Sequence, residues 1–215
     1  MDTKKKGEYD FEIAIPKELE NLQLPDPSLI QFYEGIEDRI YWILGPIDDS
    51  LYELTKYIIA WNKEDNKKGL KVKERNPIKI VIASEGGSLE VQQTLTSIIE
   101  LSKTPIYGIA IGICASAASM IYLSCKKRYA TKNATFIFHQ GGASDISGTY
   151  QQIAAFMENY AKDIENMSEF YKTHTNYEPE IIDEKLTGGD WYIDVDEAVE
   201  NGIVNTIIKD LNIFM

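Results

Sequence analysis

Two short and almost entirely apolar runs, each followed by a helical segment, constrain the fold of this chain most strongly. The runs are IKIVIAS (78–84) and IYGIAIGIC (106–114), and helices are expected over 88–102 and from Ser116. Strands that are apolar on both faces are typical of parallel sheets covered by helices. This alternation of strand and helix predicts a layered α/β fold.

The elements on either side extend the same alternation. Ser50 and Glu53 have the spacing of a capping box, which predicts the start of a helix over 50–61. The charged segment 62–76 is expected to be a surface loop. Further strands are expected at 39–45, at 134–140 and at the end of the chain, with a long helix over 149–173 and a short one before Gly202.

The first 35 residues differ from the rest of the chain. They are polar and contain three prolines, which interrupt regular structure. We therefore expect residues 1–35 to form an arm with little regular structure and residues 36–215 to form one domain. The lysines near the N-terminus are not followed by an apolar run, so no secretory signal peptide is expected.

Charge and cysteine content restrict the classes of partner. The net charge of −12 argues against binding to nucleic acid or to an anionic membrane. No apolar run reaches the roughly 18 residues of a membrane span. Cys114 and Cys125 are the only cysteines, and no zinc-binding pattern accompanies them. We expect two buried thiols and a cytoplasmic location.

Three strand ends carry residues suited to acyl transfer chemistry. The segments are SEGGS (84–88), ASAAS (115–119) and FHQGG (138–142). In α/β folds, active sites lie at the carboxyl ends of strands. Ser116 supplies a hydroxyl at a strand-to-helix turn, and the paired glycines allow a backbone amide to approach a substrate carbonyl closely.

Only two histidines are available as a base. His174 lies at the polar end of the long helix and is interpreted as a surface or helix-capping residue. His139 lies at a strand end beside glycines. Taken alone, His139 fits a satisfied core histidine better than a catalytic base.

Five segments together resemble the ClpP family of serine peptidases, in that family's order and over roughly residues 36–208. Each segment is weak by itself, but their common order and spacing make the resemblance specific. The segments are RIYWILGPIDDSLYELT, IASEGGSLEV, GICASAASM, FIFHQGG and GGDWYIDVDEAVENGIVNTII. The resemblance implies a crotonase-like α/β fold of repeated strand-helix units, with a long protruding handle helix.

The resemblance also implies the roles of individual residues. It gives a catalytic triad of Ser116, His139 and Asp190, and oxyanion-hole amides from Gly87 and Ala117. Ser119 is the rival nucleophile, because the residues AASM match the family's residues around its serine. Aligning Ser119 with the family's nucleophile requires an insertion before it and a larger deletion after it. The other residues that the resemblance concerns are Gly86, Gly141 and Gly142 for substrate binding and Gly112 as the family's glycine four residues before the nucleophile. From chemistry alone, Asp183, Asp194 and Asp196 are alternative acids because they lie close to Asp190 in sequence, and Asp194 fits a helix cap best.

The chain departs from the family at several places. No proline follows His139, and Gly189 stands where the family commonly has an arginine that couples neighbouring rings. The loop at 62–76 is longer than usual, and the first 35 residues do not resemble the family's axial loop. An apolar seam along the long helix has a/d spacing, which fits either burial within the subunit or packing of ring against ring. The seam is Ile153, Met157, Tyr160, Ile164, Met167 and Tyr171.

The function implied by the resemblance is a serine endopeptidase that cleaves polypeptides inside an oligomeric chamber. We expect a heptameric ring that can stack in pairs, a Clp-type unfoldase ATPase as a candidate partner, and neither a metal nor another cofactor for the chemistry. Two alternatives remain open. One is a non-catalytic ClpP-like scaffold subunit, and the other is a crotonase-type acyl-CoA enzyme, which would leave Ser116 and His139 unexplained.

Overall fold

The computed structural model describes residues 26–142 and 146–214. The chain from Gly35 onward forms one compact unit, which is separate from the residues before it. This unit holds the sheet and the candidate active site. The expected division into an arm and a domain at residues 35 and 36 stays a prediction.

Helix α1 (Pro27–Glu37) corrects the expectation that residues 1–35 have little regular structure. The Asp26 carboxylate accepts hydrogen bonds from the Ser28 amide at 2.8 Å and the Ser28 hydroxyl at 2.6 Å. Pro27 occupies the first helical position, where its fixed φ and missing N–H suit a helix start. The helix buries none of its side chains. Residues 1–25 lie outside the described residues.

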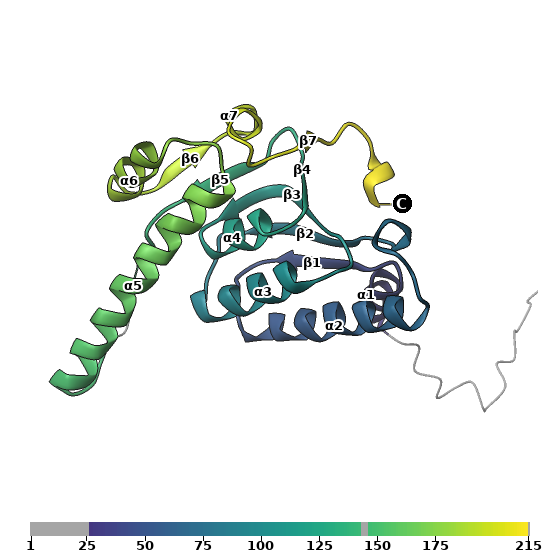
Figure 1. The fold of residues 1–215 in the computed structure, drawn as a ribbon, viewed down its shortest axis with the longest axis horizontal. Coiled ribbons are helices and arrows are strands. Elements are labelled where there is room, and N and C mark those ends of the chain that lie inside the picture. Colours follow the sequence, from purple (N-terminus) through teal and green to yellow (C-terminus); the bar gives the residue numbers. More distant parts are fainter. Residues whose placement is uncertain (1–25, 143–145, 215) are drawn as a thin grey trace, which may run out of the picture. The chain divides into compact units, whose positions relative to one another are not determined.

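A seven-stranded sheet forms the centre of the unit that begins at Gly35 (Figure 1). Its order is β1-β2-β3-β4-β7, and β5 pairs with the far end of β3 and with β6. All pairs are parallel except β5 with β6, which is antiparallel. The strands are β1 (Ile40–Leu44), β2 (Ile78–Ser84), β3 (Ile106–Ala115), β4 (Lys127–Ala130), β5 (Thr135–Phe138), β6 (Trp191–Ile193) and β7 (Thr206–Ile207).

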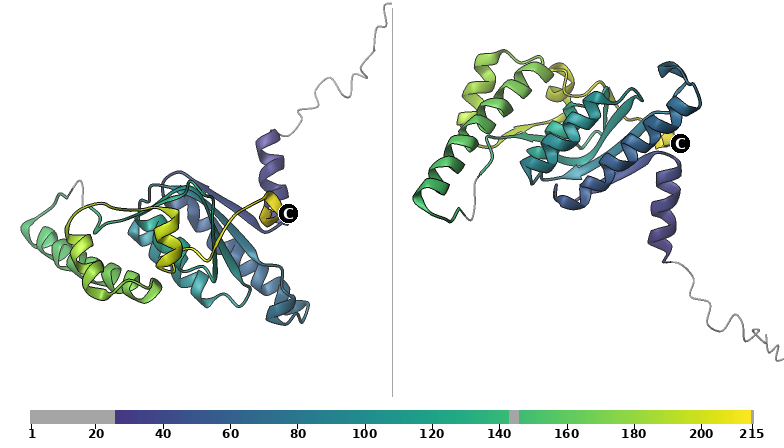
Figure 2. Two further views of the ribbon diagram at one scale, coloured as in Figure 1. Left: turned by 90° about the horizontal axis from the view of Figure 1, so that it is seen from above. Right: turned by 60° about the horizontal axis from the view of Figure 1, so that its bottom comes forward.

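Helices α2, α3 and α4 lie along the side of this sheet that the right view of Figure 2 brings forward, whereas α5 and α6 lie toward its β5–β6 end (Figure 1). The helices are α2 (Tyr52–Lys67), α3 (Leu89–Leu101), α4 (Ala117–Leu123), α5 (Tyr150–His174), α6 (Pro179–Thr187) and α7 (Val195–Glu200). Single 3₁₀ turns occur at Asp49–Leu51, Val72–Glu74 and Leu211–Phe214. Helix α5 extends well beyond the sheet (Figure 1), which confirms the expected handle helix. Within the described residues, no helix has the length and apolar character needed to span a membrane.

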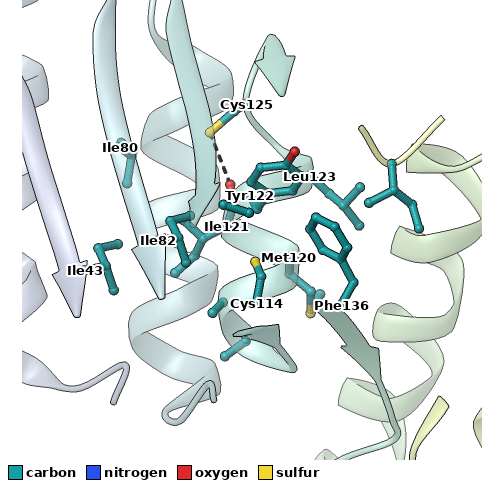
Figure 3. Packing of buried hydrophobic residues seen from close by; sticks show 14 of the residues in the cluster. Ile43, Ile80, Ile82, Cys114, Met120, Ile121, Tyr122, Leu123, Cys125 and Phe136 are labelled. Atoms are coloured by element: carbon teal, nitrogen blue, oxygen red, sulfur yellow. Dashed lines mark hydrogen bonds between the residues drawn. The ribbon is translucent and has the colours of Figure 1, made fainter. Parts of the chain in front are cut away.

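The core lies between the sheet and these helices (Figure 3). Alternate side chains of β2 point toward the helices, so Ile80 and Ile82 are fully buried. Tyr122 of α4 and Phe136 of β5 continue the core, with ring centroids 5.2 Å apart. The two cysteines are free and buried within the same cluster, as expected. Burial raises the pKa of the Cys125 thiol to about 12.

The segment around α2 differs most from the prediction. Asp48, rather than Ser50, caps the first turn, because its carboxylate accepts the Ser50 amide at 3.0 Å. The helix then continues to Lys67, so residues 62–67 are not part of a loop. The reason is Asp65, which is 1% exposed and forms an ion pair with Arg39 at 2.8 Å. The short elements β4, α6 and β6 were not predicted either.

Candidate active site

Strand register brings the three predicted catalytic residues to one edge of the sheet. In the parallel pair of β3 with β5, Ala115 lies opposite Ile137, and the Ser116 amide donates to the Ile137 carbonyl at 2.8 Å. In the antiparallel pair of β5 with β6, Phe138 lies opposite Trp191. His139 and Asp190 are therefore the next facing pair, directly beyond the end of the ladder.

His139 and Asp190, the predicted base and acid, lie within ion-pair distance of each other. The His139 Nδ1 atom is 3.3 Å from the Asp190 Oδ1 atom, with side chains 31% and 56% exposed. Within the described residues, His139 Nε2 is buried and has no hydrogen-bond partner. When a carboxylate engages Nδ1 of an imidazole, Nε2 is left to accept a proton. The pair therefore has the arrangement of an oriented general base.

Ser116 occupies a strained turn between β3 and α4. Its backbone has φ 53° and ψ −129°, a conformation that residues with a side chain rarely adopt. The residue is 8% exposed, and no hydrogen bond joins its hydroxyl to any described residue. Catalytic hydrogen bonds are often unformed until substrate binds, so the lack of a hydrogen bond between Ser116 and His139 is compatible with a nucleophile and its base.

Backbone amides suited to an oxyanion lie beside this turn. Among residues 26–142 and 146–214, no oxygen accepts a hydrogen bond from the amide of Gly87 or of Ala117. Gly86 has φ +99°, and a Cβ atom there would lie 2.7 Å from the Ser116 Cβ atom. Gly86 thus lets the backbone approach the serine more closely than any side chain would permit.

Ser119 has a different environment from Ser116. Its side chain is fully buried, and its hydroxyl donates to the Ser116 carbonyl at 2.7 Å. The same hydroxyl lies 3.0 Å from the Tyr171 hydroxyl of α5. Tyr171 in turn stacks on Phe138 at 4.1 Å, next to His139. Ser119 therefore supports the Ser116 turn, a role that its sequence position does not predict.

Two of the three alternative acids have other partners. Asp194 caps α7 by accepting from the Asp196 and Glu197 amides, as expected for the cap. Asp183 forms an ion pair with Lys172 at 2.7 Å. Asp190 is therefore the carboxylate at the histidine.

The sequence places two aromatic residues, Trp191 and Tyr192, directly after Asp190, where they could shield its bond to His139. Trp191 is buried and packs edge-on against Phe138 at 5.8 Å. Tyr192 is 63% exposed, so the expectation was wrong for this residue. Its position follows from strand alternation, which turns successive side chains to opposite faces.

The remaining predicted residues lie near the site with fewer contacts. Gly141 has φ +79°, and nothing lies within 4 Å of a Cβ built at Gly142. Residues 143–145 of this expected substrate-pairing edge lie outside the described residues. His174 bonds the Phe170 carbonyl at 2.8 Å at the end of α5, which agrees with its interpretation as a helix-end residue.

No group of three or more His, Cys, Asp or Glu side chains in the described part of the chain is arranged to hold a metal ion.

Replacing Gly86 with alanine is expected to lower kcat for a reaction at Ser116 by about 100-fold, because the new methyl group would displace Ser116. The built Cβ lies 3.1 Å from the Ala117 amide nitrogen as well as against the serine. Gly112→Ala is the matched control, since its nearest neighbour would be the Ala83 Cβ atom at an ordinary 3.7 Å. Steady-state kinetics of the two variants would refute this account if both lost activity equally.

Comparison with known proteins agrees with the fold and with the order of these segments. A family model described as Clp protease matches residues 30–210. Two proteins named ATP-dependent Clp protease proteolytic subunit 2 are similar to 62% of this chain and 67% of their own length. The one from Treponema denticola is 32% identical over 140 residues, and the one from Treponema pallidum is 27% identical over 138 residues.

A solved structure shares the fold. The structure of a ClpP1 mutant from Listeria monocytogenes superposes with a TM-score of 0.70, covering 84% of this chain and 96% of that chain at 24% identity. The layered arrangement of β1 to β7 and the handle helix is thus the ClpP fold. Together with the match over residues 30–210, this shows that the chain belongs to the Clp protease family.

Proposed function

We propose that this chain is a serine endopeptidase of the ClpP type that hydrolyses peptide bonds through Ser116, His139 and Asp190. The observation that carries the proposal is the contact of 3.3 Å between His139 Nδ1 and Asp190, together with the unpaired His139 Nε2 atom. Membership of a family of proteases supports the same reading.

The geometry supports a two-step mechanism. Ser116 Oγ attacks the scissile carbonyl while His139 Nε2 accepts the hydroxyl proton, and Asp190 holds the imidazole in the required tautomer. The amides of Gly87 and Ala117 stabilise the negative charge that develops on the carbonyl oxygen. His139 then protonates the leaving amine, and a water molecule hydrolyses the acyl-enzyme through the same groups.

Covalent labelling tests the proposal directly. A fluorophosphonate probe is expected to modify Ser116, identified by mass spectrometry of the labelled peptide. His139→Ala should abolish labelling, because the hydroxyl then lacks its base, whereas His174→Ala should leave labelling unchanged. Labelling at Ser119, or equal losses from the two histidine variants, would contradict the assignment.

The alternative functions fit the structure less well. A non-catalytic scaffold subunit would not need a strained serine beside an oriented histidine and two unpaired amides. An acyl-CoA enzyme would use the amides but leaves the histidine-aspartate pair without a role. Absence of labelling in a folded protein would favour the scaffold alternative.

We also propose assembly into a heptameric chamber in which two rings can stack through α5. The apolar seam divides into two halves along this helix. Met167 and Tyr171 are buried in the subunit core, which corrects the possibility that the whole seam is available for ring packing. Ile153 and Met157 are 36% and 49% exposed, so the first half of the helix presents apolar side chains to solvent.

Met157→Asp is expected to weaken association between rings while leaving the subunit folded, because a charge would replace an exposed apolar contact. Sedimentation velocity should show a shift from double rings to single rings. Glu158→Gln, at the adjacent exposed position, is the control and should leave the distribution unchanged. An unchanged distribution in Met157→Asp would refute the role of this half of the helix.

The partners proposed from the family are polypeptide substrates and a Clp-type unfoldase ATPase, with a cytoplasmic location. The named relatives are proteolytic subunits of ATP-dependent proteases, which supports a partner of this kind. The net charge of −12 supports the absence of nucleic-acid and anionic-membrane partners.

A further inference from the structure

A groove between α3 and α5 has lining residues that are close in sequence to the candidate active site. Its volume is about 310 Å³, and its lining includes Leu89 and Met120. Leu89 follows Gly87 by two residues, and Met120 lies one helical turn after Ser116. Because helical side chains tilt toward the N-terminus of their helix, Met120 extends back toward the Ser116 end of α4. Leu89 and Met120 thus mark the end of the groove that is nearest in sequence to Gly87 and Ser116.

The lining of the groove is apolar in one part and polar in another. Leu89, Met120, Met167 and Phe170 contribute apolar surface, whereas amides, hydroxyls and carboxylates contribute the remainder. The groove is lined by no lysine or arginine from the described residues. This composition suits a long side chain with an apolar stem and a hydrogen-bond donor at its end.

Gln92 supplies a buried acceptor at this groove. The residue is 2% exposed, and its Nε2 atom donates to the Thr96 hydroxyl at 2.9 Å. Its Oε1 atom is buried and accepts no hydrogen bond from any described residue. Burying an amide oxygen without a hydrogen bond costs free energy. A ligand that donates a hydrogen bond to Gln92 Oε1 would remove that cost.

Asp163 supplies a negative charge that no cation within the described residues neutralises by direct contact. Its carboxylate oxygens accept hydrogen bonds from the neutral amides of Gln93 at 3.2 Å and Asn159 at 3.3 Å. Glu100, farther along the groove, differs because it lies 3.7 Å from His174 Nε2. Asp163 is thus the carboxylate that is available to a cationic ligand.

We infer that this groove binds a lysine side chain of the substrate, at the residue whose carbonyl Ser116 attacks. The methylene stem packs on Met120 and Met167, and the ammonium group donates to Asp163 and Gln92 Oε1. Lysine has the required form, an apolar stem that ends in three donors and a positive charge. The inference rests on the proposed peptidase function and adds a substrate class to it.

Two fluorogenic peptides that differ at one residue test this inference in the full-length protein. One has lysine before the cleaved bond and the other has norleucine, which keeps an apolar stem but lacks the ammonium group. We expect kcat/KM to be about tenfold higher for the lysine peptide, the size of effect given by a hydrogen-bonded charge at a partly solvated site. Asp163→Asn should reduce this preference to less than about threefold, and Gln92→Leu should reduce it in part.

The controls separate this inference from the proposed function. Glu158→Gln removes one charge from the same helix outside the groove and should preserve the preference for lysine. Equal cleavage of the two peptides by the wild-type protein would overturn the inference and leave the peptidase function intact, as would an undiminished preference in Asp163→Asn. If neither peptide is cleaved and no probe labels Ser116, the proposed function fails and the inference fails with it.

Discussion

Ser116→Ala is expected to lower the rate of peptide cleavage by about 10,000-fold or more while leaving the fold intact. The expectation follows from the chemistry, because the variant loses the nucleophile and retains only binding and the oxyanion amides. Alanine is a suitable replacement since Ser116 is buried and its hydroxyl makes no hydrogen bond to a described residue. Steady-state cleavage of a fluorogenic peptide measures the loss, and circular dichroism checks the fold.

Ser119→Ala is the matched control for this prediction. It removes a hydroxyl from the same segment, one turn later, and breaks the bonds to the Ser116 carbonyl and to Tyr171. We expect a loss of less than about tenfold, because the nucleophile stays in place and only its support is weakened. Full activity in Ser116→Ala together with inactivity in Ser119→Ala would transfer the nucleophilic role to Ser119.

The sheet and its helices could be predicted because local pattern and tertiary structure agree there. The apolar strands β2 and β3 and the helices α3 and α5 are formed where the sequence predicts them. The predicted α/β fold is confirmed by its similarity to a ClpP structure.

The elements that were missed depend on long-range contacts. The last turns of α2 look like a charged loop in sequence, but Asp65 is buried there by Arg39, which precedes it by 26 residues. Strand β6 is only three residues long and exists through its pairing with β5. Local sequence carries no information about either partner.

In the candidate site too, motifs predict which residues take part, but they do not predict the long-range contacts of the side chains. The positions of Ser116, His139 and Asp190 followed from motif order, and the strand register brings His139 and Asp190 into contact. The support of the Ser116 turn by Ser119 and Tyr171 could not be predicted, because these residues are 52 positions apart. Tyr171 was visible only as a member of an apolar seam, which does not reveal what its hydroxyl contacts.

Asp65→Asn is expected to reduce the free energy of unfolding by about 3 kcal/mol, because it leaves the Arg39 guanidinium buried without its main carboxylate partner. Arg39 donates to both Asp65 oxygens, at 2.9 Å and 2.8 Å, and Thr104 donates to one of them at 2.7 Å. The three residues join the start of β1, the end of α2 and the turn before β3. Urea titration monitored by tryptophan fluorescence measures the change.

The pH dependence of this effect has a defined sign. Burial alone would raise the pKa of Asp65, but the hydrogen bonds from Arg39 and Thr104 outweigh burial and lower the pKa below its ordinary value of 3.8. The stabilisation is therefore complete above about pH 4 and is lost as the pH falls through the lower pKa of the folded state. The difference in stability between wild type and Asp65→Asn should shrink only in this acidic range.

A second ion pair on the same helix provides the control for burial. Glu53 and Lys56 are 2.6 Å apart at the other end of α2, with side chains 56% and 70% exposed. Glu53→Gln should change the free energy of unfolding by less than about 0.5 kcal/mol, because water solvates both charges after the pair is broken. The double variant Arg39→Met/Asp65→Leu should be less destabilised than Asp65→Asn, since no buried charge is then left unpaired. If the double variant were less stable than Asp65→Asn, the loss of stability would come from losing the attraction between Arg39 and Asp65. It would then not come from leaving Arg39 buried without a partner.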